Sequence, residues 1–225
     1  MQKITLAVFD MAGTVVNENN VVYKTLQKVI NSAGYNNSLD FVLEHGAGKE
    51  KHQAIKDILK ATEGKNNDSL AASLFVNFKK ELKLAYENLE VSSYLEVEAL
   101  MIDLKNKGLK IALNTGYDTK TAQSLLDKMG WVQGREYDVL VTADDVENGR
   151  PNPDMILKAM EYFEILDASK VLKAGDSIID IEEGKNANCG ITVGVTTGAH
   201  TRQQLESANP TYVLDQLIEL KSILV

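Results

Sequence analysis

The sequence predicts an α/β protein, in which a parallel sheet is covered by helices and a helical segment is inserted after the first strand. Two features of the pattern carry this prediction. From Glu96 onward, helical and strand-like patterns alternate, which is typical of a parallel sheet whose strands are joined by helices. Residues 21–89, by contrast, place their apolar residues at helical spacing, so we expect no strand of the sheet there.

The first strand is expected at Ile4–Phe9, which is apolar at most positions, as a strand covered on both faces requires. Asp10 follows directly, and Ala12-Gly13-Thr14 come next. In an open parallel sheet, functional groups gather beyond the carboxyl ends of the strands. We therefore predict that Asp10 meets a substrate, since a carboxylate can attack phosphorus as a nucleophile. The alternative is an Asp that only caps a turn.

Three amphipathic helices are expected in the inserted segment. They span Val22–Ala33, Lys49–Ala61 and Ser69–Leu89, and the linking stretches Gly34–Leu39 and Glu63–Asp68 are polar and rich in Asn. We therefore predict two domains, a Rossmann-like core of residues 1–16 and 91–225 and a helical cap of residues 17–90. A cap of this kind would close an active site against water during reaction.

Polar residues follow the later strands as well. The strand Leu109–Thr115 ends in a hydroxyl, Arg150 follows the strand Val139–Thr142, and the strand that begins at Val171 leads to Asp176 and then Asp180. A further strand is expected at Ile191–Val195. One sheet would bring these polar groups together with Asp10 at one edge. A nucleophile, a hydroxyl donor, a guanidinium and two extra carboxylates suit phosphoryl transfer assisted by a hard cation.

Four segments, those that contain Asp10, Thr115, Arg150 and Asp176 with Asp180, resemble in order and spacing the motifs of the haloacid dehalogenase superfamily of hydrolases. The resemblance covers essentially the whole chain. It implies that Asp10 is the nucleophile and that Thr115 and Arg150 bind the phosphoryl group. It also implies a Mg²⁺ cofactor, whose ligands would be Asp176, Asp180, Asp10 and the carbonyl of Ala12.

Ala12 departs from the pattern of most phosphatases of that superfamily, which carry a second Asp two residues after the nucleophile to protonate the leaving oxygen. General acid help is typically worth roughly 100- to 10,000-fold in rate. The sequence Asp-x-Ala-Gly-Thr resembles instead the phosphonoacetaldehyde hydrolases (phosphonatases) and the phosphonatase-like hydrolases, which cleave a carbon–phosphorus bond. The resemblance implies P–C cleavage of phosphonoacetaldehyde or a related small phosphonate. The alternative is a phosphatase of small phosphorylated metabolites, of the phosphoglycolate or sugar-phosphate type.

The cap segment Gly46–His52 extends the phosphonatase resemblance. Lys49 and His52 match a lysine and a histidine of that family, in which the lysine forms a Schiff base with the substrate aldehyde. Tyr117, after Thr115 and Gly116, also matches, and the resemblance implies that Gly116, Tyr117 and His52 contact substrate. Two positions differ, since Asn20 stands where a cysteine is expected and His45 where a methionine is expected.

The spacing of three residues predicts that Lys49 and His52 share one face of a helix, while Lys51 points elsewhere. Only a neutral amine attacks a carbonyl, so a catalytic lysine needs a pKa below its usual value near 10.4. Lys49 could instead bind the substrate as a cation, or be a solvated lysine in the first turn of a helix. His52 could equally be an ordinary surface or core histidine.

Composition limits the partners. The net charge is −8 and the 24 Lys and Arg residues form no basic block, which argues against nucleic acid. No stretch approaches the roughly 18 apolar residues of a membrane span, and no signal peptide is visible. The single cysteine, Cys189, cannot form an internal disulfide, which favours a cytoplasmic protein. We expect a small phosphonate or phosphate as the partner, and both a monomer and a homodimer remain open.

The sequence thus predicts a magnesium-dependent hydrolase that forms an aspartyl-phosphate intermediate. A catalytically silent binding protein on the same scaffold is a further hypothesis. Asp10, Thr115, Arg150, Asp176 and Asp180 weigh against it, because the whole catalytic set is present.

Overall fold

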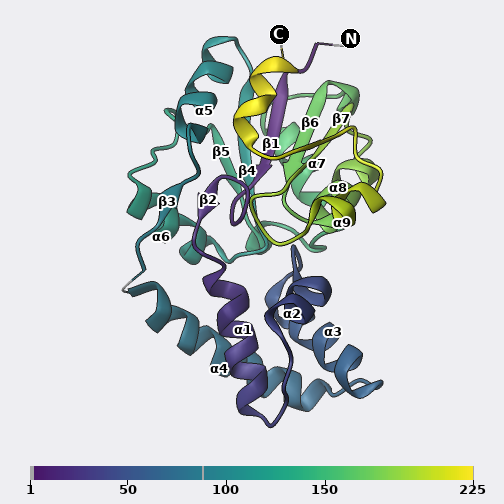
Figure 1. Cartoon of the computed structure of the whole chain (residues 1–225). Coiled ribbons are helices and arrows are strands. Elements are labelled where there is room, and N and C mark those ends of the chain that lie inside the picture. The colour runs from purple at the N-terminus through teal and green to yellow at the C-terminus, as the bar shows by residue number, and fades with distance from the viewer. Residues whose placement is uncertain (1–2, 88, 225) are drawn as a thin grey trace.

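The computed structural model describes residues 3–87 and 89–224. A parallel sheet of six strands forms the centre of the molecule, in the order β5-β4-β1-β6-β7-β8 (Figure 1). The strands are β1 (Leu6–Asp10), β4 (Lys110–Asn114), β5 (Val139–Val141), β6 (Val171–Gly175), β7 (Ile191–Val195) and β8 (Tyr212–Leu214). The sequence pattern did not indicate β8. The α/β fold class with a parallel sheet is confirmed.

Helices cover both faces of the sheet. They are α5 (Val97–Asn106), α6 (Thr119–Met129), α7 (Asp154–Tyr162), α8 (Ile178–Asn186) and α9 (Arg202–Ser207), with 3₁₀ turns at Ala143–Asp145, Ala168–Lys170 and Leu217–Ser222. Successive residues of β1 contribute to two separate hydrophobic clusters, because side chains along a strand alternate between faces. Ala7 and Phe9 belong to one cluster, whereas Leu6 and Val8 pack with the other. This burial on both faces explains the continuous apolar pattern of β1.

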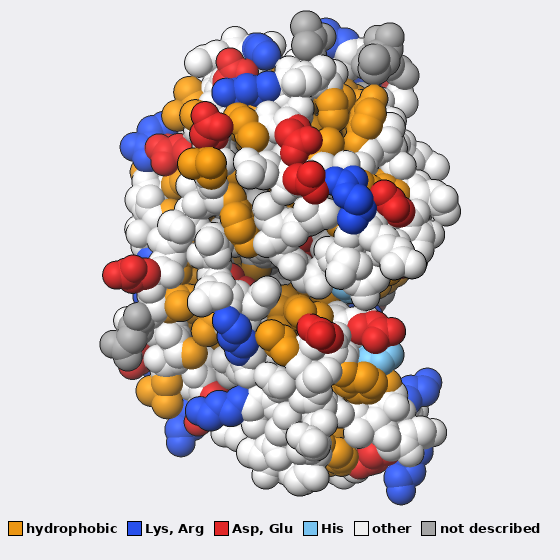
Figure 2. Space-filling model, viewed as in Figure 1, with side chains coloured by type: hydrophobic (Ala, Val, Ile, Leu, Met, Phe, Trp, Pro, Cys, Tyr) orange, Lys and Arg blue, Asp and Glu red, His pale blue; other side chains and the backbone are white. Residues whose placement is uncertain are grey.

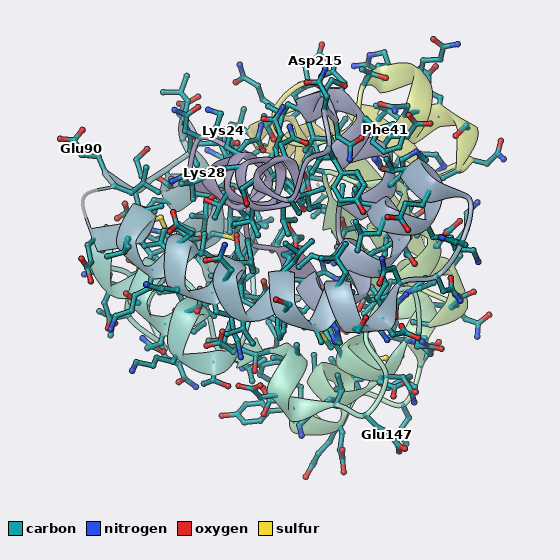
Figure 3. The ribbon with its side chains drawn as sticks, turned by 90° about the horizontal axis from the view of Figure 1, so that it is seen from below. Lys24, Lys28, Phe41, Glu90, Glu147 and Asp215 are labelled. Carbon is teal, nitrogen blue, oxygen red and sulfur yellow. The ribbon has the colours of Figure 1, made fainter. Side chains whose placement is uncertain are left out.

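Four helices lie below the carboxyl ends of the strands in Figure 1 and form the cap. They are α1 (Val21–Ser32), α2 (Leu39–Gly46), α3 (Lys51–Glu63) and α4 (Asp68–Glu87). Figure 3, drawn from below, shows α4 crossing in front of the core, with Lys28 on α1 and Phe41 on α2. Figure 2 shows hydrophobic side chains gathered where the cap meets the core on this face.

The predicted start of the second expected cap helix is wrong by two residues, and α2 before it was not expected from the sequence. We expected a helix at Lys49–Ala61, but α3 begins at Lys51 because the Glu50 side chain caps it, accepting hydrogen bonds from the backbone N–H groups of His52 and Gln53 at 2.9 Å each. Lys49 therefore lies outside the helix, and its predicted position on one helix face with His52 is incorrect.

The chain passes between core and cap at a short antiparallel pair, in which β2 (Val16–Asn17) lies beside β3 (Ser92–Ser93). The predicted domain boundaries, after residue 16 and before residue 91, fall beside these two strands, and they stay a prediction. Among the described residues, no helix is both long and apolar enough to cross a membrane.

Candidate active site

Asp10 lies at the carboxyl end of β1, buried at the centre of the sheet edge that faces the cap. One carboxylate oxygen accepts a hydrogen bond of 2.6 Å from Nη1 of Arg150, and the hydroxyl of Thr14 lies 3.5 Å from the other oxygen. Burial raises the pKa of Asp10, and the negative charge of Asp180 adds to this rise, while Arg150 opposes it. The cation thus supports the charged form that a nucleophile needs.

Arg150 is held on several sides. Its Nη2 donates to the backbone and side-chain oxygens of Asn114 at 2.7 and 2.8 Å, and its other nitrogens lie 3.0 Å from Asp180 and 3.1 Å from Glu183. Burial alone would lower the pKa of Arg150, but the carboxylates of Asp180, Asp10 and Glu183 outweigh burial and raise it. The guanidinium is therefore permanently charged and fixed beside the nucleophile.

Asp176 follows β6 and lies beside Asp10. Its carboxylate accepts a hydrogen bond of 2.6 Å from the backbone N–H of Ala199. Burial raises the pKa of Asp176 well above its usual value, and the charges of Asp10 and Asp180 raise it further. Gly13 allows the loop after β1 to lie close to Asp176, because it has φ +87° and a Cβ there would lie 2.2 Å from a carboxylate oxygen of Asp176.

Asp180, in the first turn of α8, completes the acidic group. Burial would raise its pKa, but Arg150 and Lys173 outweigh burial, so the pKa of Asp180 is lowered. Lys173 Nζ lies 3.0 Å from Asp180, and the Ser177 hydroxyl donates to the same carboxylate at 2.5 Å. Asp10, Asp176 and Asp180 each offer an oxygen within 4.8 Å of the others. Three clustered carboxylates, two of them with raised pKa, suit a hard divalent cation that takes oxygen ligands.

The structure places Thr115 and Arg150 at the same edge of the sheet as the acidic group. Thr115 follows β4 directly and is buried, and its hydroxyl accepts a hydrogen bond of 3.3 Å from the backbone N–H of Tyr117. Gly116 lies against the cap, where a Cβ would be 3.3 Å from the carbonyl oxygen of Lys49. Tyr117 is buried, and its hydroxyl lies 3.2 Å from that of Tyr86 on α4. These residues therefore form part of the contact between core and cap.

The cap lysines lie differently from the expected arrangement. Lys49 Nζ is 2.5 Å from a carboxylate oxygen of Asp57, within the cap, and its side chain is 26% exposed. His52 stacks on Phe75 of α4 with ring centroids 5.0 Å apart. Lys51, expected to point elsewhere, is buried instead, and its amine lies between the rings of Tyr23 and Tyr117 at 5.3 and 5.6 Å. The structure thus brings Lys51 to the core side of the cap.

The cap loop before α3 rests on the core. Gly48 has φ +74°, and a Cβ there would lie 2.5 Å from the hydroxyl oxygen of Ser177, three residues before Asp180. The backbone N–H of Gly48 donates to the hydroxyl of Tyr23 at 3.1 Å. A cavity of about 780 Å³ lies between α4 and α6, and its lining includes Lys51, Gly116 and Tyr117. The cap loop therefore packs against the core close to Asp180.

Two buried charged residues, Lys173 and Glu18, were not identified from the sequence. Lys173 is fully buried in β6 and lies 3.1 Å from Glu183, and it donates to the side-chain oxygen of Asn114 at 2.6 Å. A lysine in the middle of an otherwise apolar strand was the signal for Lys173. Glu18, just before α1, is 2% exposed, and burial raises its pKa to about 7. No sequence pattern marked Glu18, because its burial depends on the cap helices that surround it.

Sequence comparison assigns a family to residues 7–195, which match the model of the haloacid dehalogenase-like hydrolases. The chain is 30% identical over its whole length to a phosphonoacetaldehyde hydrolase of Latilactobacillus sakei, covering 96% of that protein. It is also 29% identical to the pyrophosphatase PpaX of Bacillus mycoides, with 99% of this chain and 97% of that protein covered.

Solved structures show the same fold. A phosphonoacetaldehyde hydrolase-like protein from Oleispira antarctica superposes with a TM-score of 0.83 at 21% identity, covering 98% of this chain and 91% of that one. A hydrolase from Pseudomonas syringae gives a TM-score of 0.82 at 21% identity, covering 97% and 96%. The family model and the full-length similarity show that the chain belongs to the haloacid dehalogenase-like hydrolases.

Proposed function

We propose that this hydrolase cleaves the carbon–phosphorus bond of phosphonoacetaldehyde or a closely related small phosphonate, through an aspartyl-phosphate on Asp10. The observation that carries the proposal is Ala12, two residues after the nucleophile, whose methyl group cannot protonate a leaving oxygen. A carbon leaving group does not need an acid at that position. The full-length similarity to a phosphonoacetaldehyde hydrolase supports the same substrate class.

The contacts of Asp10 and Arg150 support an in-line attack on phosphorus. The carboxylate of Asp10 is kept beside a permanent positive charge, so a phosphoryl group that arrives at Asp10 meets the guanidinium of Arg150 and the hydroxyl of Thr115. The ion pairs of Arg150 with Asp180 and Glu183 hold the guanidinium in place, which limits reorganisation during the reaction. Water would then hydrolyse the aspartyl-phosphate.

We propose Mg²⁺ as the cofactor, held by Asp10, Asp176, Asp180 and the carbonyl of Ala12. When bound, the cation would neutralise the negative charge that the phosphoryl group and the carboxylates bring together. The raised pKa of Asp176 supports this assignment, because burial among carboxylates leaves that group in need of a positive charge. Ser177 and the N–H of Ala199 orient the carboxylates of Asp180 and Asp176 respectively.

A phosphatase of small phosphorylated metabolites is the second candidate. The contact between Lys49 and Asp57 favours it, because the amine of Lys49 is engaged by a carboxylate within the cap. The similarity to a pyrophosphatase also favours hydrolysis of a P–O bond. The resemblance assigns the Schiff base to Lys49, and that role stays a prediction.

A substrate panel tests the two functions. Purified protein with Mg²⁺ is given phosphonoacetaldehyde, pyrophosphate, phosphoglycolate and sugar phosphates, and phosphate and acetaldehyde are measured separately. Equal release of phosphate and acetaldehyde from phosphonoacetaldehyde, at a kcat/KM at least about tenfold above that for any ester, is the expected result. Faster hydrolysis of an ester or of pyrophosphate, without acetaldehyde release, would establish the phosphatase function instead.

A further inference from the structure

The loop that follows β7 closes around Asp176. The backbone N–H of Ala199 donates to the Asp176 carboxylate at 2.6 Å, and the N–H of His200 donates to the Asp176 backbone oxygen at 3.2 Å. The hydroxyl of Thr197 donates to the backbone oxygen of Gly13 at 2.6 Å, so the same loop also holds the turn after β1. His200 is therefore fixed next to two of the segments that carry the candidate catalytic residues.

The imidazole of His200 caps the helix α8 from outside it. His200 is buried, and its Nδ1 accepts a hydrogen bond of 3.0 Å from the backbone N–H of Ile178, the first residue of α8. The first N–H groups of a helix have no partner within the helix. Ser177, the residue before α8, caps none of them with its side chain, and its hydroxyl donates instead to the Asp180 carboxylate. His200 thus supplies the acceptor that Ser177 does not.

The position of α8 determines where Asp180 lies. Asp180 is in the first turn of α8, and its carboxylate lies 3.0 Å from both Nη1 of Arg150 and Nζ of Lys173. A Cβ on Gly175 would lie 2.1 Å from Cγ of Asp180, so this side chain packs directly against the end of β6. An aspartate held this tightly keeps its contacts only if the first turn of its helix stays in place.

The other ring nitrogen of His200 faces the cap. Because Nδ1 accepts a hydrogen bond, the neutral ring carries its proton on Nε2. Nε2 is buried and makes no hydrogen bond to the residues that the structure describes. Burial lowers the pKa of His200, while the backbone carbonyl of Leu43, on the cap helix α2, opposes the change. The Nε2–H donor therefore lies on the side of the ring that faces Leu43, where an approach of the cap would complete a hydrogen bond.

We propose that His200 is a positioning residue that couples the cap to the acidic group. Its Nδ1 holds the first turn of α8 and so keeps Asp180 in place as a ligand, and its Nε2–H bonds the carbonyl of Leu43 when the cap tightens over a bound substrate. Hydrogen bonds of an active site are often long in the free enzyme and shorten when substrate binds. The inference rests on the proposed Mg²⁺ site, and it holds for cleavage of either a P–C or a P–O bond.

Two substitutions separate the roles of the two nitrogens. The amide oxygen of His200→Asn can occupy the position of Nδ1 and accept from the N–H of Ile178, but no atom of this side chain reaches Leu43. The amide nitrogen of His200→Gln can occupy the position of Nε2 and donate to Leu43, but this side chain has no acceptor at the position of Nδ1. Gln203→Ala, at an exposed position of α9, is the control.

The Kd for Mg²⁺, measured by isothermal titration calorimetry without substrate, tests the role of Nδ1. We expect a Kd at least about tenfold above that of the wild type in His200→Gln, and within about twofold of it in His200→Asn and in the control. Ile178→Pro removes the same hydrogen bond from the donor side, at the first helical position, where proline is well tolerated, and should raise the Kd to a similar degree. A wild-type Kd in either His200→Gln or Ile178→Pro would overturn the positioning role.

Steady-state kinetics at saturating Mg²⁺, with the substrate that the wild type cleaves fastest, test the role of Nε2. His200→Asn should raise KM about fivefold and leave kcat within about twofold, because only the bond to the cap is lost. His200→Gln should lower kcat about tenfold and leave KM within about twofold, because Asp180 is then poorly held. A wild-type KM in His200→Asn would overturn the coupling to the cap.

The wild type reports on the proposed function separately. If it binds no Mg²⁺ or releases no phosphate, the proposed site fails and the inference about His200 fails with it. Normal wild-type behaviour with variants that cannot be distinguished from one another overturns the inference alone. A purely structural role for His200 would lower the melting temperature of both variants without separating the Kd for Mg²⁺ from KM, and this result would also overturn the inference.

Discussion

In the core, the candidate catalytic residues follow strands of the sheet, whereas in the cap the two lysines Lys49 and Lys51 lie at the start of one helix. Asp10 follows its strand by position alone, and the parallel pairing of β1 with β4 and β6 carries Thr115 and Asp176 to the same edge. Glu50 caps α3, so Lys49 lies before this helix and Lys51 is its first residue. Strand pairing therefore places the core groups, while a single helix cap separates the two cap lysines.

Replacing the nucleophile should give the largest effect and test the core side of this comparison. Asp10→Asn should lower turnover of any substrate by at least about a thousandfold, because an amide cannot form the aspartyl-phosphate. The fold should survive, since Arg150 keeps Asp180 and Glu183 as partners. Steady-state kinetics and circular dichroism check both statements. Phosphate release near the wild-type rate would contradict the nucleophile assignment.

Removing a proposed metal ligand should show that the core site needs a cation. Mg²⁺ at about 100 times its Kd should raise the melting temperature of the wild type by roughly 5 to 10 °C. Asp176→Asn should lose this shift and at least about a hundredfold in activity. Asp127→Asn, on the exposed side of α6, is the matched control and should keep both. A full Mg²⁺ shift in Asp176→Asn would rule out Asp176 as a ligand.

The same contrast explains what the sequence could and could not predict. The whole of β7 agrees with the strand predicted at Ile191–Val195, because its β-branched residues leave a clear local signal. The partners of Arg150 were not predictable, since Glu183 joins it only through the folded contact between α8 and the sheet. The start of α3 was misplaced because Glu is an uncommon helix cap. Local signals locate elements, but not the contacts between them.

The raised pKa of Glu18, which directly follows β2 at the junction of core and cap, can be tested by the pH dependence of stability. Burial raises its pKa from 4.5 to about 7, so the folded protein holds this proton more tightly than the unfolded chain does. The stability that depends on this proton is fully present below pH 4.5 and is lost as the pH rises through about 7. Glu18→Gln stays neutral and can still accept the hydrogen bond from the N–H of Val22.

We therefore expect Glu18→Gln and the wild type to be nearly equal in stability near pH 4.5. Above pH 7 the variant should be more stable by up to about 3 kcal/mol. Urea unfolding at a series of pH values measures the difference. Glu90→Gln, an exposed position beyond α4 that is labelled in Figure 3, is the control and should show no such pH dependence. A difference that does not change with pH would contradict the raised pKa of Glu18.

The smallest expected effect concerns the docking of the cap loop, and a matched pair of glycines isolates it. Gly48 and Gly64 have nearly the same backbone, at φ +74° and +73°, but a Cβ on Gly48 would meet Ser177 and Ile179 of the core, whereas Gly64 has nothing within 4 Å. Each change to Ala should cost about 1 kcal/mol of folding stability, because an L residue disfavours positive φ.

Only Gly48→Ala should also disturb the reaction, because its side chain would push the cap loop away from Ser177 and Ile179 of the core. We expect kcat/KM to fall about tenfold in Gly48→Ala and to stay within about twofold of the wild type in Gly64→Ala. Steady-state kinetics, with melting temperatures recorded for both variants, separate the two effects. Equal kinetics in the two variants would show that contact between the cap loop and the core does not affect the reaction, and the core alone would then account for catalysis.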